Sequence, residues 1–224
     1  QGLTAANVQA GGALINTDGK DIAIAQPLLD AGGGLTKNGA GTLALNGVNT
    51  YTAATTVNAG LLGGTGTINS PVTVNSGAGI APGSGGMGNL TVNSNLVLSA
   101  NTTNVFEVNG TTLANDSVAL GAAVTYGGVL QIIPSGTFSS GQTFTLFSGA
   151  GRFSASNFAS VLGSPGGGLA FTVTNGVLSV VGGGVPSPTT LTSSYNPGTG
   201  VLSLSWPAGQ GWRLQSQINN RSVG

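Results

Sequence analysis

Short stretches of alternating apolar and polar residues recur along almost the whole chain. Their core-type positions, separated by one residue, are Ile22/Ile24, Leu43/Leu45, Thr55/Val57, Val72/Val74, Leu90/Val92, Leu96/Leu98, Val118/Leu120, Leu130/Ile132, Phe144/Leu146, Phe171/Val173 and Leu178/Val180. A period of two is typical of β-strands that bury one face. Turn-forming pairs such as Asn38-Gly39, Asn46-Gly47 and Asn109-Gly110 lie between these stretches, and such pairs reverse or bend a chain. The pattern predicts an all-β protein made of many short strands.

Two architectures accommodate such strands: an antiparallel sandwich, and a solenoid whose successive coils stack their strands in parallel. A sandwich usually keeps its polar faces soluble with Lys, Glu and Arg, whereas only 4% of these 224 residues are charged. Thr, Ser and Asn take their place, and these side chains can stack in ladders between coils. The chain contains 41 Gly and 9 Pro, but it lacks the Gly-X-Y period of collagen. The composition therefore favours the β-solenoid.

A weak internal repeat supports this choice. The segment Leu35-Thr-Lys-Asn-Gly-Ala-Gly-Thr-Leu43 aligns with Val72-Thr-Val-Asn-Ser-Gly-Ala-Gly-Ile80. Both segments consist of an apolar residue, Thr, one variable residue and Asn, followed by a glycine-rich corner and a second strand. We expect coils of roughly 20 residues, which is within the range of known repeat units.

Residues 33–61 carry a family resemblance. Their sequence, GGLTKNGAGTLALNGVNTYTAATTVNAGL, resembles the autotransporter-associated β-strand repeat, whose pattern is close to GGLTKxGxGTLxLxGxNTYTGxTTVNAGxL. Ala53 stands where the family usually has Gly, at one of the turns. The resemblance implies a right-handed parallel β-helix on exported bacterial surface or extracellular proteins, and we expect residues 1–181 to form this solenoid.

The balance of charge and the missing residue types exclude several functions. Five Lys and Arg balance five Asp and Glu, and there is no His and no Cys. Without a basic surface, nucleic acid is a poor candidate partner. Disulfides, thiolate metal sites and cysteine nucleophiles are excluded. No segment reaches the roughly 18 apolar residues of a spanning helix, and residues 1–20 do not form a signal peptide, so any export signal is expected outside this chain.

Residues 182–190 are expected to form a Gly/Pro linker, because three glycines precede two prolines that cannot join a central strand. Residues 191–224 are expected to contain a β-hairpin with arms at 201–206 and 212–217. Their sequence resembles a C-terminal motif of secreted proteins from Verrucomicrobia-type bacteria. One hairpin buries too little surface to be stable alone, so the segment is expected to dock on its own solenoid or on a neighbouring copy.

The apolar residues of this tail are the candidate self-association site. They are Leu202, Leu204, Trp206, Trp212 and Leu214. Tryptophan is enriched among residues that dominate interface energies. The two Trp side chains either anchor the hairpin to another surface or form its own small core.

Candidate catalytic groups are few. Proton transfer in hydrolytic enzymes needs ionisable groups a few Å apart. Asp18 and Asp21 form the only close pair in the sequence, within a string that is typical of a solvated turn, and calcium binding there is a weaker alternative. Asp30 precedes another turn, and Glu107 and Asp116 stand apart. We therefore expect no catalytic site, no metal site and no cofactor.

Two further features are given structural interpretations. Residues 83–88 match the pattern Gly-x-Gly-x-x-Gly, but no helix pattern follows, so a loop is expected and not a dinucleotide site. Most aromatic residues are expected in the core or at its ends. They are Tyr51, Phe106, Tyr126, Phe138, Phe144, Phe147, Phe153, Phe158 and Phe171.

The leading functional hypothesis is a secreted, non-catalytic structural protein that joins copies of itself head to tail into filaments. Open strand edges at both solenoid ends, the scarcity of charge and the incomplete tail favour it. The alternatives are an adhesin or passenger-like module, with a cell-surface polysaccharide as a further candidate partner, and a polysaccharide-degrading β-helix enzyme. A pocket lined by converging carboxylates would argue against the structural hypothesis.

Overall fold

The computed structural model describes residues 4–149, 157–182 and 192–205. Every regular element in these ranges is a β-strand. No helix in the described ranges is long and apolar enough to cross a membrane. The chain divides into two compact units, residues 1–183 and residues 184–224. Each unit is described separately below.

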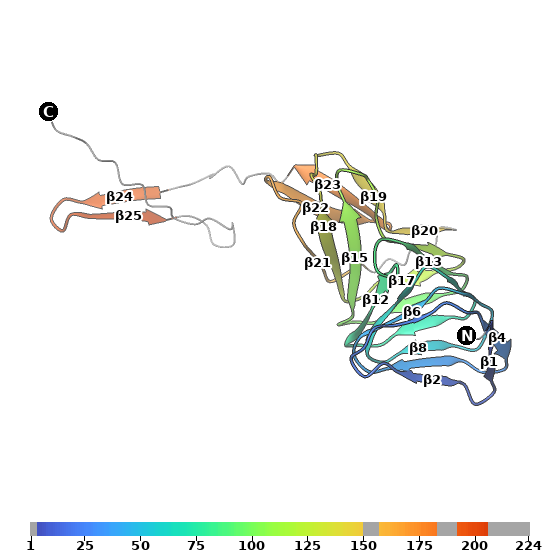
Figure 1. The fold of residues 1–224 in the computed structure, drawn as a ribbon. Coiled ribbons are helices and arrows are strands. Elements are labelled where there is room, and N and C mark those ends of the chain that lie inside the picture. The colour runs from blue at the N-terminus through green and yellow to red at the C-terminus, as the bar shows by residue number, and fades with distance from the viewer. Residues whose placement is uncertain (1–3, 150–156, 183–191, 206–224) are drawn as a thin grey trace. The chain divides into compact units, whose positions relative to one another are not determined.

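The first unit is a β-solenoid with three faces, in which successive coils stack from β1 to β21 (Figure 1). The first face contains β2 (Ala13–Asn16), β5 (Leu35–Asn38), β8 (Thr55–Val57), β11 (Val72–Val74), β14 (Leu96–Leu98) and β17 (Val124–Thr125). Neighbouring strands in this face are parallel. Because the connections are whole coils, the sheet is continuous although no two of its strands are consecutive in sequence.

The other two faces follow the same rule. The second face contains β3 (Ile22–Ile24), β6 (Thr42–Leu45), β9 (Gly60–Gly64) and β12 (Ala78–Pro82), and then β15 (Thr103–Asn109), β18 (Val129–Ser135) and β21 (Ser160–Leu162). The third face contains β1 (Ala6–Gln9), β4 (Leu28–Ala31), β7 (Val48–Asn49), β10 (Thr67–Ile68), β13 (Asn89–Val92), β16 (Ser117–Leu120) and β20 (Phe147–Gly149). The all-β solenoid predicted from the sequence is confirmed.

Coil length varies more than the sequence suggested. In the first face, Ala13 pairs with Leu35, Leu35 with Thr55, and Thr55 with Val72, which gives coils of 22, 20 and 17 residues. The next two coils, to Leu96 and Val124, contain 24 and 28 residues. The longer coils carry extra loop residues at their corners, while the strand register inside the solenoid is kept.

The internal repeat found in the sequence is a true structural repeat. Leu35 and Val72 both pair with Thr55, and Leu43 and Ile80 both pair with Leu62. The aligned segments therefore occupy the same place two coils apart. Their Asn residues stack as well: Asn58 Nδ2 donates to Asn38 Oδ1 at 2.9 Å and Asn75 Nδ2 donates to Asn58 Oδ1 at 2.8 Å. This ladder satisfies polar side chains at one corner without any charge.

The core changes character along the solenoid. Leu, Ile and Val fill the early coils, whereas aromatic rings gather in the last ones. Phe147 contacts Phe106 and Tyr126 with ring centroids 5.2 Å apart in each pair. Of the aromatic residues expected in the core, all except Phe153 are buried or half-buried, and Phe153 is outside the described residues.

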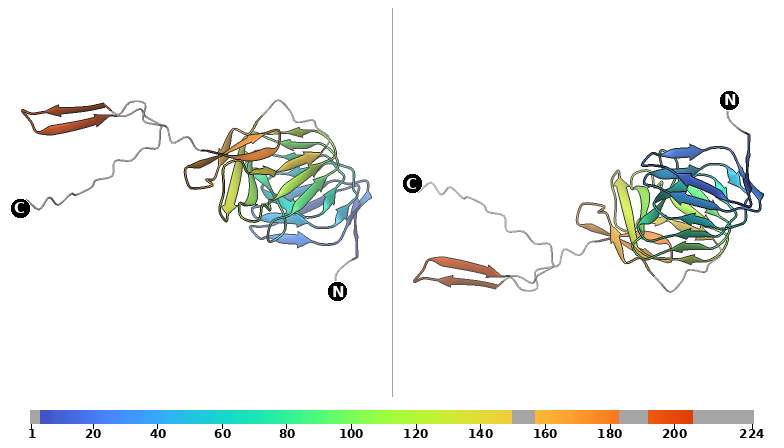
Figure 2. Two further views of the ribbon diagram at one scale, coloured as in Figure 1. Left: turned by 90° about the horizontal axis from the view of Figure 1, so that it is seen from above. Right: turned by 90° about the horizontal axis from the view of Figure 1, so that it is seen from below.

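Three antiparallel strands close the solenoid core beside its last coils. They are β19 (Thr143–Thr145), β23 (Val177–Gly182) and β22 (Leu169–Thr174). Figure 2 shows β22 and β23 in orange beside the green and yellow coils. The buried residues Leu178 and Val180 of β23 belong to the same core as the coils. The antiparallel sheet thus covers the core at this end, while β17, β20 and β21 remain the last strands of their own sheets.

The described part of the second unit is a two-stranded antiparallel sheet. Strand β24 (Thr192–Asn196) pairs with β25 (Val201–Ser205) across the turn at residues 197–200. The first predicted arm, 201–206, is thus a strand up to Ser205. Its partner is β24, which precedes it in the chain, and the second predicted arm, 212–217, lies outside the described residues.

Candidate functional site

The predicted self-association residues lie mostly outside the described structure. Leu202 and Leu204 belong to β25. Trp206, Trp212 and Leu214 are outside the described residues. Two other apolar side chains of the same unit are strongly exposed, Tyr195 at 63% and Val201 at 53%. The site assigned to this tail therefore remains a prediction.

The acidic pair Asp18 and Asp21 occupies the expected turn. Both side chains are exposed, and Asp18 has a positive φ of 49°. Asp21 Oδ1 accepts a hydrogen bond of 2.7 Å from the backbone N–H of Thr42, so it ties one coil to the next. Among the described residues, no group of three His, Cys, Asp or Glu side chains is placed to hold a metal ion.

The glycine-rich segment 83–88 is a loop, as predicted, and it folds back over the outside of the second face. Gly83 and Gly64 form an isolated antiparallel bridge, with N–H to O distances of 2.7 and 3.0 Å. Asn46 Nδ2 donates to Ser84 Oγ at 3.1 Å. No helix follows the loop, because β13 begins at Asn89. The segment thus forms a wall beside the sheet.

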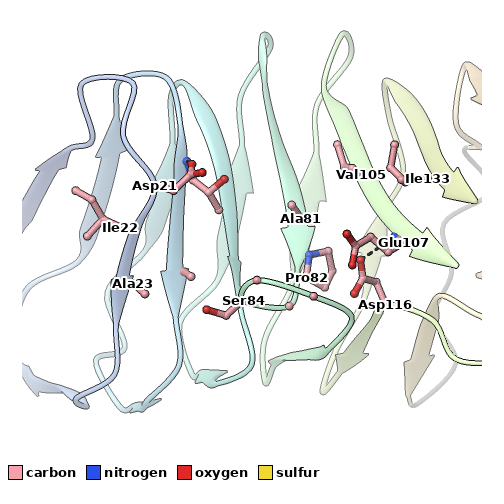
Figure 3. Close-up of a pocket in the computed structure, with 15 residues that line it drawn as sticks. Asp21, Ile22, Ala23, Ala81, Pro82, Ser84, Val105, Glu107, Asp116 and Ile133 are labelled. Carbon is pink, nitrogen blue, oxygen red and sulfur yellow. Dashed lines mark hydrogen bonds between the residues drawn. The ribbon is translucent and has the colours of Figure 1, made fainter. Parts of the chain in front are cut away.

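This wall borders a groove of about 360 Å³ on the outside of the second face (Figure 3). The floor consists of small side chains, among them Ala23, Ala44 and Ala81. Asp21 lies toward one end of the groove, and Glu107 and Asp116 lie at the other. The groove is the strongest candidate for a site in the described part of the solenoid.

Glu107 and Asp116, which stand apart in the sequence, share this end of the groove. Asp116 is only 2% exposed. Its Oδ1 accepts the backbone N–H of Gly88 at 2.8 Å, and its Oδ2 accepts the backbone N–H of Glu107 at 2.7 Å. This is the kind of carboxylate pair that would favour an enzyme. Both oxygens of Asp116, however, already bind the chain itself and hold the end of the glycine loop against β15.

A tight turn brings the two carboxylates together. Val108 and Asn115 form an antiparallel bridge, and Asn109 caps the turn by accepting the N–H groups of Thr111 and Thr112 at 2.9 Å. In such a hairpin, the residue before Val108 lies opposite the residue after Asn115. The Asn109-Gly110 signal could therefore have located the pair, had it been interpreted as a hairpin and not as a simple bend.

The buried carboxyl of Asp116 predicts a pH dependence of stability. Burial raises its pKa to about 6, the repulsion from Glu107 adds to this, and the two N–H bonds oppose it. The folded protein thus binds this proton more tightly than the unfolded chain. Its contribution is fully present below the unfolded pKa of about 3.8 and is lost as the pH rises through 6. We expect the free energy of unfolding to fall between pH 4 and pH 7 in urea denaturation.

The matched variant is Asp116→Asn, which keeps one acceptor but cannot titrate. Its free energy of unfolding should vary less over this range than that of the wild type. The same decline in both proteins would show that another group is responsible.

A second buried charged group lies inside the solenoid. Lys37 is fully buried, and its inward position places it in a row with Ile15 and Val57. Its Nζ donates to Thr17 Oγ1 at 3.1 Å and to the carbonyl oxygens of Gly39 and Ala59 at 2.9 Å each. Burial lowers the pKa of Lys37, and Asp21 opposes this. Three good acceptors match the three protons of an ammonium group.

A polar network follows in the next coils. Tyr51 Oη and Thr55 Oγ1 are 2.8 Å apart, and Thr55 Oγ1 and Ser70 Oγ are 2.6 Å apart. Burial raises the pKa of Tyr51, and the hydroxyl bonds of Thr55 and Ser70 lower it. All three residues are fully buried. The polar residues of this region therefore bind one coil to another.

The comparisons with known proteins fit this arrangement. The family model described as the passenger-associated-transport-repeat matches residues 35–63, the segment that runs from β5 to β9 and contains Lys37, Tyr51 and Thr55. None of the curated proteins compared with the chain matches it. The chain is thus a β-solenoid protein that carries a passenger-associated-transport-repeat, an autotransporter-associated β-strand repeat.

Proposed function

We propose that this chain is a non-catalytic structural protein of the bacterial surface or its surroundings, which joins copies of itself head to tail into filaments. The passenger-associated-transport-repeat and the solenoid support the coarser part, a passenger-like surface protein. The more specific statement, that copies associate with one another, is supported by the small exposed sheet of the second unit.

The observation that carries the proposal is the small sheet of the second unit. Strands β24 and β25 form a two-stranded sheet within the described residues, and an isolated two-stranded hairpin is marginally stable at best in water. Tyr195 and Val201 expose most of their surface. A partner surface would cover them and supply further strand pairing.

The closed end of the solenoid also favours the second unit as the part that makes the contact between copies. Because β19, β22 and β23 close the core beside the last coils, coils of another copy cannot extend the core there. A contact between copies at this end of the chain would then depend on residues 184–224. The near absence of charge also weakens the repulsion between identical rods.

Removing residues 186–224 should abolish polymers. The full chain is expected to form filaments in negative-stain electron microscopy, whereas the chain ending at Val185 should sediment as a soluble monomer. The shortened chain should retain the strand signal and the unfolding midpoint of the solenoid, because the two units are separately compact. Filaments of normal length from the shortened chain would refute the role of the second unit.

The passenger-like repeat also favours a second candidate function, an adhesin that binds a cell-surface polysaccharide or protein. This function would use the flank of the solenoid and would not require polymers. Binding of the chain ending at Val185 to a glycan array would favour it over the filament proposal.

A further inference from the structure

The groove on the second face has an uneven charge. The described cations, Lys20 and Lys37, do not line the groove. Both are nearer its Asp21 end: Lys20 precedes Asp21 directly, and Asp21 acts electrostatically on Lys37, which is buried inside the solenoid. At the other end, Glu107 raises the pKa of Asp116, and no cation contributes to the surroundings of that group within the described residues. The Glu107–Asp116 end of the groove therefore carries two carboxyl groups and no neighbouring cation among the described residues.

The two units of the chain carry opposite formal charges. All five carboxylates precede residue 117, and with Lys20, Lys37 and Arg152 they give residues 1–183 a formal charge of −2. Residues 184–224 contain Arg213 and Arg221 and no carboxylate, so their formal charge is +2. A chain that is neutral as a whole is thus divided into an acidic solenoid and a basic second unit.

The shape of the groove suits an extended segment. Its floor has only small side chains at Ala23, Ala44 and Ala81, so they do not obstruct an extended chain. The wall formed by residues 83–88 is held in place by the Gly64–Gly83 bridge and by Asp116. The site is therefore formed before any partner arrives, which lowers the cost of ordering on binding. Glu107 is half-buried, and its side chain lies at the groove.

We propose that this groove is the docking site for the basic C-terminal segment, residues 206–224, of a second copy, with Arg213 or Arg221 against Glu107, beside the buried Asp116. A guanidinium is the best match for the carboxylate of Glu107, because its planar N–H groups bind the two oxygens of a carboxylate as a pair. The inference rests on the proposed self-association and names the surface that it would use.

The test uses the full chain and single conservative variants. Glu107→Gln removes the charge but keeps the backbone N–H that binds Asp116, so the variant should fold. Asp18→Asn is the matched control, because it removes one exposed carboxylate outside the groove at a turn position where Asn is well tolerated. Arg213→Gln and Arg221→Gln remove the proposed partners one at a time.

Sedimentation velocity and electron microscopy should show that Glu107→Gln raises the concentration needed for polymers about tenfold, as expected for the loss of a close interfacial charge pair. The Asp18→Asn control should stay within about twofold of the wild type. One Arg variant should reproduce the loss, and combining it with Glu107→Gln should cost little more, because both changes remove the same contact.

A direct binding measurement separates the two proposals. A labelled synthetic peptide of residues 206–224 is titrated into the chain ending at Val185, with and without Glu107→Gln. Binding that Glu107→Gln weakens supports the groove even if the full chain forms no filaments. Normal filaments from Glu107→Gln, together with peptide binding that is unaffected by it, overturn the groove and leave self-association in place. Charge-dependent binding of the tail within one molecule, seen as a compact monomer, also overturns it.

Discussion

Replacing Gly79 by alanine should cost the solenoid about 3 kcal/mol or more, as overpacking of a rigid site does. Gly79 lies in β12, and a Cβ at this position would meet the carbonyl oxygen of Thr103 at the start of β15 and the side chain of Leu61. The backbone carbonyl of Thr103 cannot rotate away from the added methyl group as a flexible side chain could. The methyl group should therefore force β15 away from β12, at the point where the second face passes from one group of strands to the next.

Urea denaturation should show this as a lower midpoint. It should also show lower cooperativity, because coils that contact only their neighbours unfold separately once one contact is weakened. Gly11→Ala is the matched control: it has no atom within 4 Å of the added Cβ and no positive φ, and its effect should stay within about 0.5 kcal/mol. An unchanged midpoint for Gly79→Ala would mean that the two strand groups can separate freely.

Replacing Lys37 by methionine should cost about 2 to 4 kcal/mol, since bonds to a charged donor are stronger than neutral ones and their loss leaves acceptors unpaired. Methionine fills a similar volume but leaves Thr17 Oγ1 and the carbonyl oxygens of Gly39 and Ala59 without this donor. Burial opposes the effect, because an ammonium group is costly to remove from water. We expect the hydrogen bonds to prevail, because all three protons have acceptors.

The matched control for Lys37→Met is Lys20→Met, which removes the same side chain from an exposed position and should change the free energy of unfolding by less than about 0.5 kcal/mol. Equal stability of Lys37→Met and the wild type in urea would show that desolvation cancels the bonds. A carbonyl-lined corner of this kind also limits substitution at Gly60, since a Cβ there would lie 2.8 Å from Lys37 Nζ.

The strands of the solenoid could be predicted because burial on one face leaves a period-two pattern. Pairs such as Val72/Val74 and Leu96/Leu98 are buried as expected, and the match of Leu35–Leu43 with Val72–Ile80 corresponds to coils that share the same partners. The direction of pairing is not encoded in this period. Phe171/Val173 and Leu178/Val180 therefore resembled the coils before them, although β22 and β23 are antiparallel.

The polar chemistry was harder to predict. The alternation that places Leu35 inside also places Lys37 inside, but the general exposure of lysine argues for the opposite position. Only Thr17 Oγ1 and the carbonyl oxygens of Gly39 and Ala59, two of these acceptors a coil away, make its burial favourable. The Glu107–Asp116 pair likewise depends on one hairpin at Asn109, which the Asn109-Gly110 pair indicates only if it is interpreted as a hairpin turn and not as a simple bend.

The antiparallel closure by β19, β22 and β23 has a consequence for how such a rod could change in length. Each coil bonds to its neighbouring coils, and the closing strands form a separate sheet that pairs with none of them. Tandem duplication of one unit, such as the 20 residues from Leu35 to Ala54, would insert one rung and lengthen the rod by about 4.8 Å, the spacing of neighbouring strands. The closing strands would be carried along unchanged, so this architecture can be lengthened from within while its finished end stays the same.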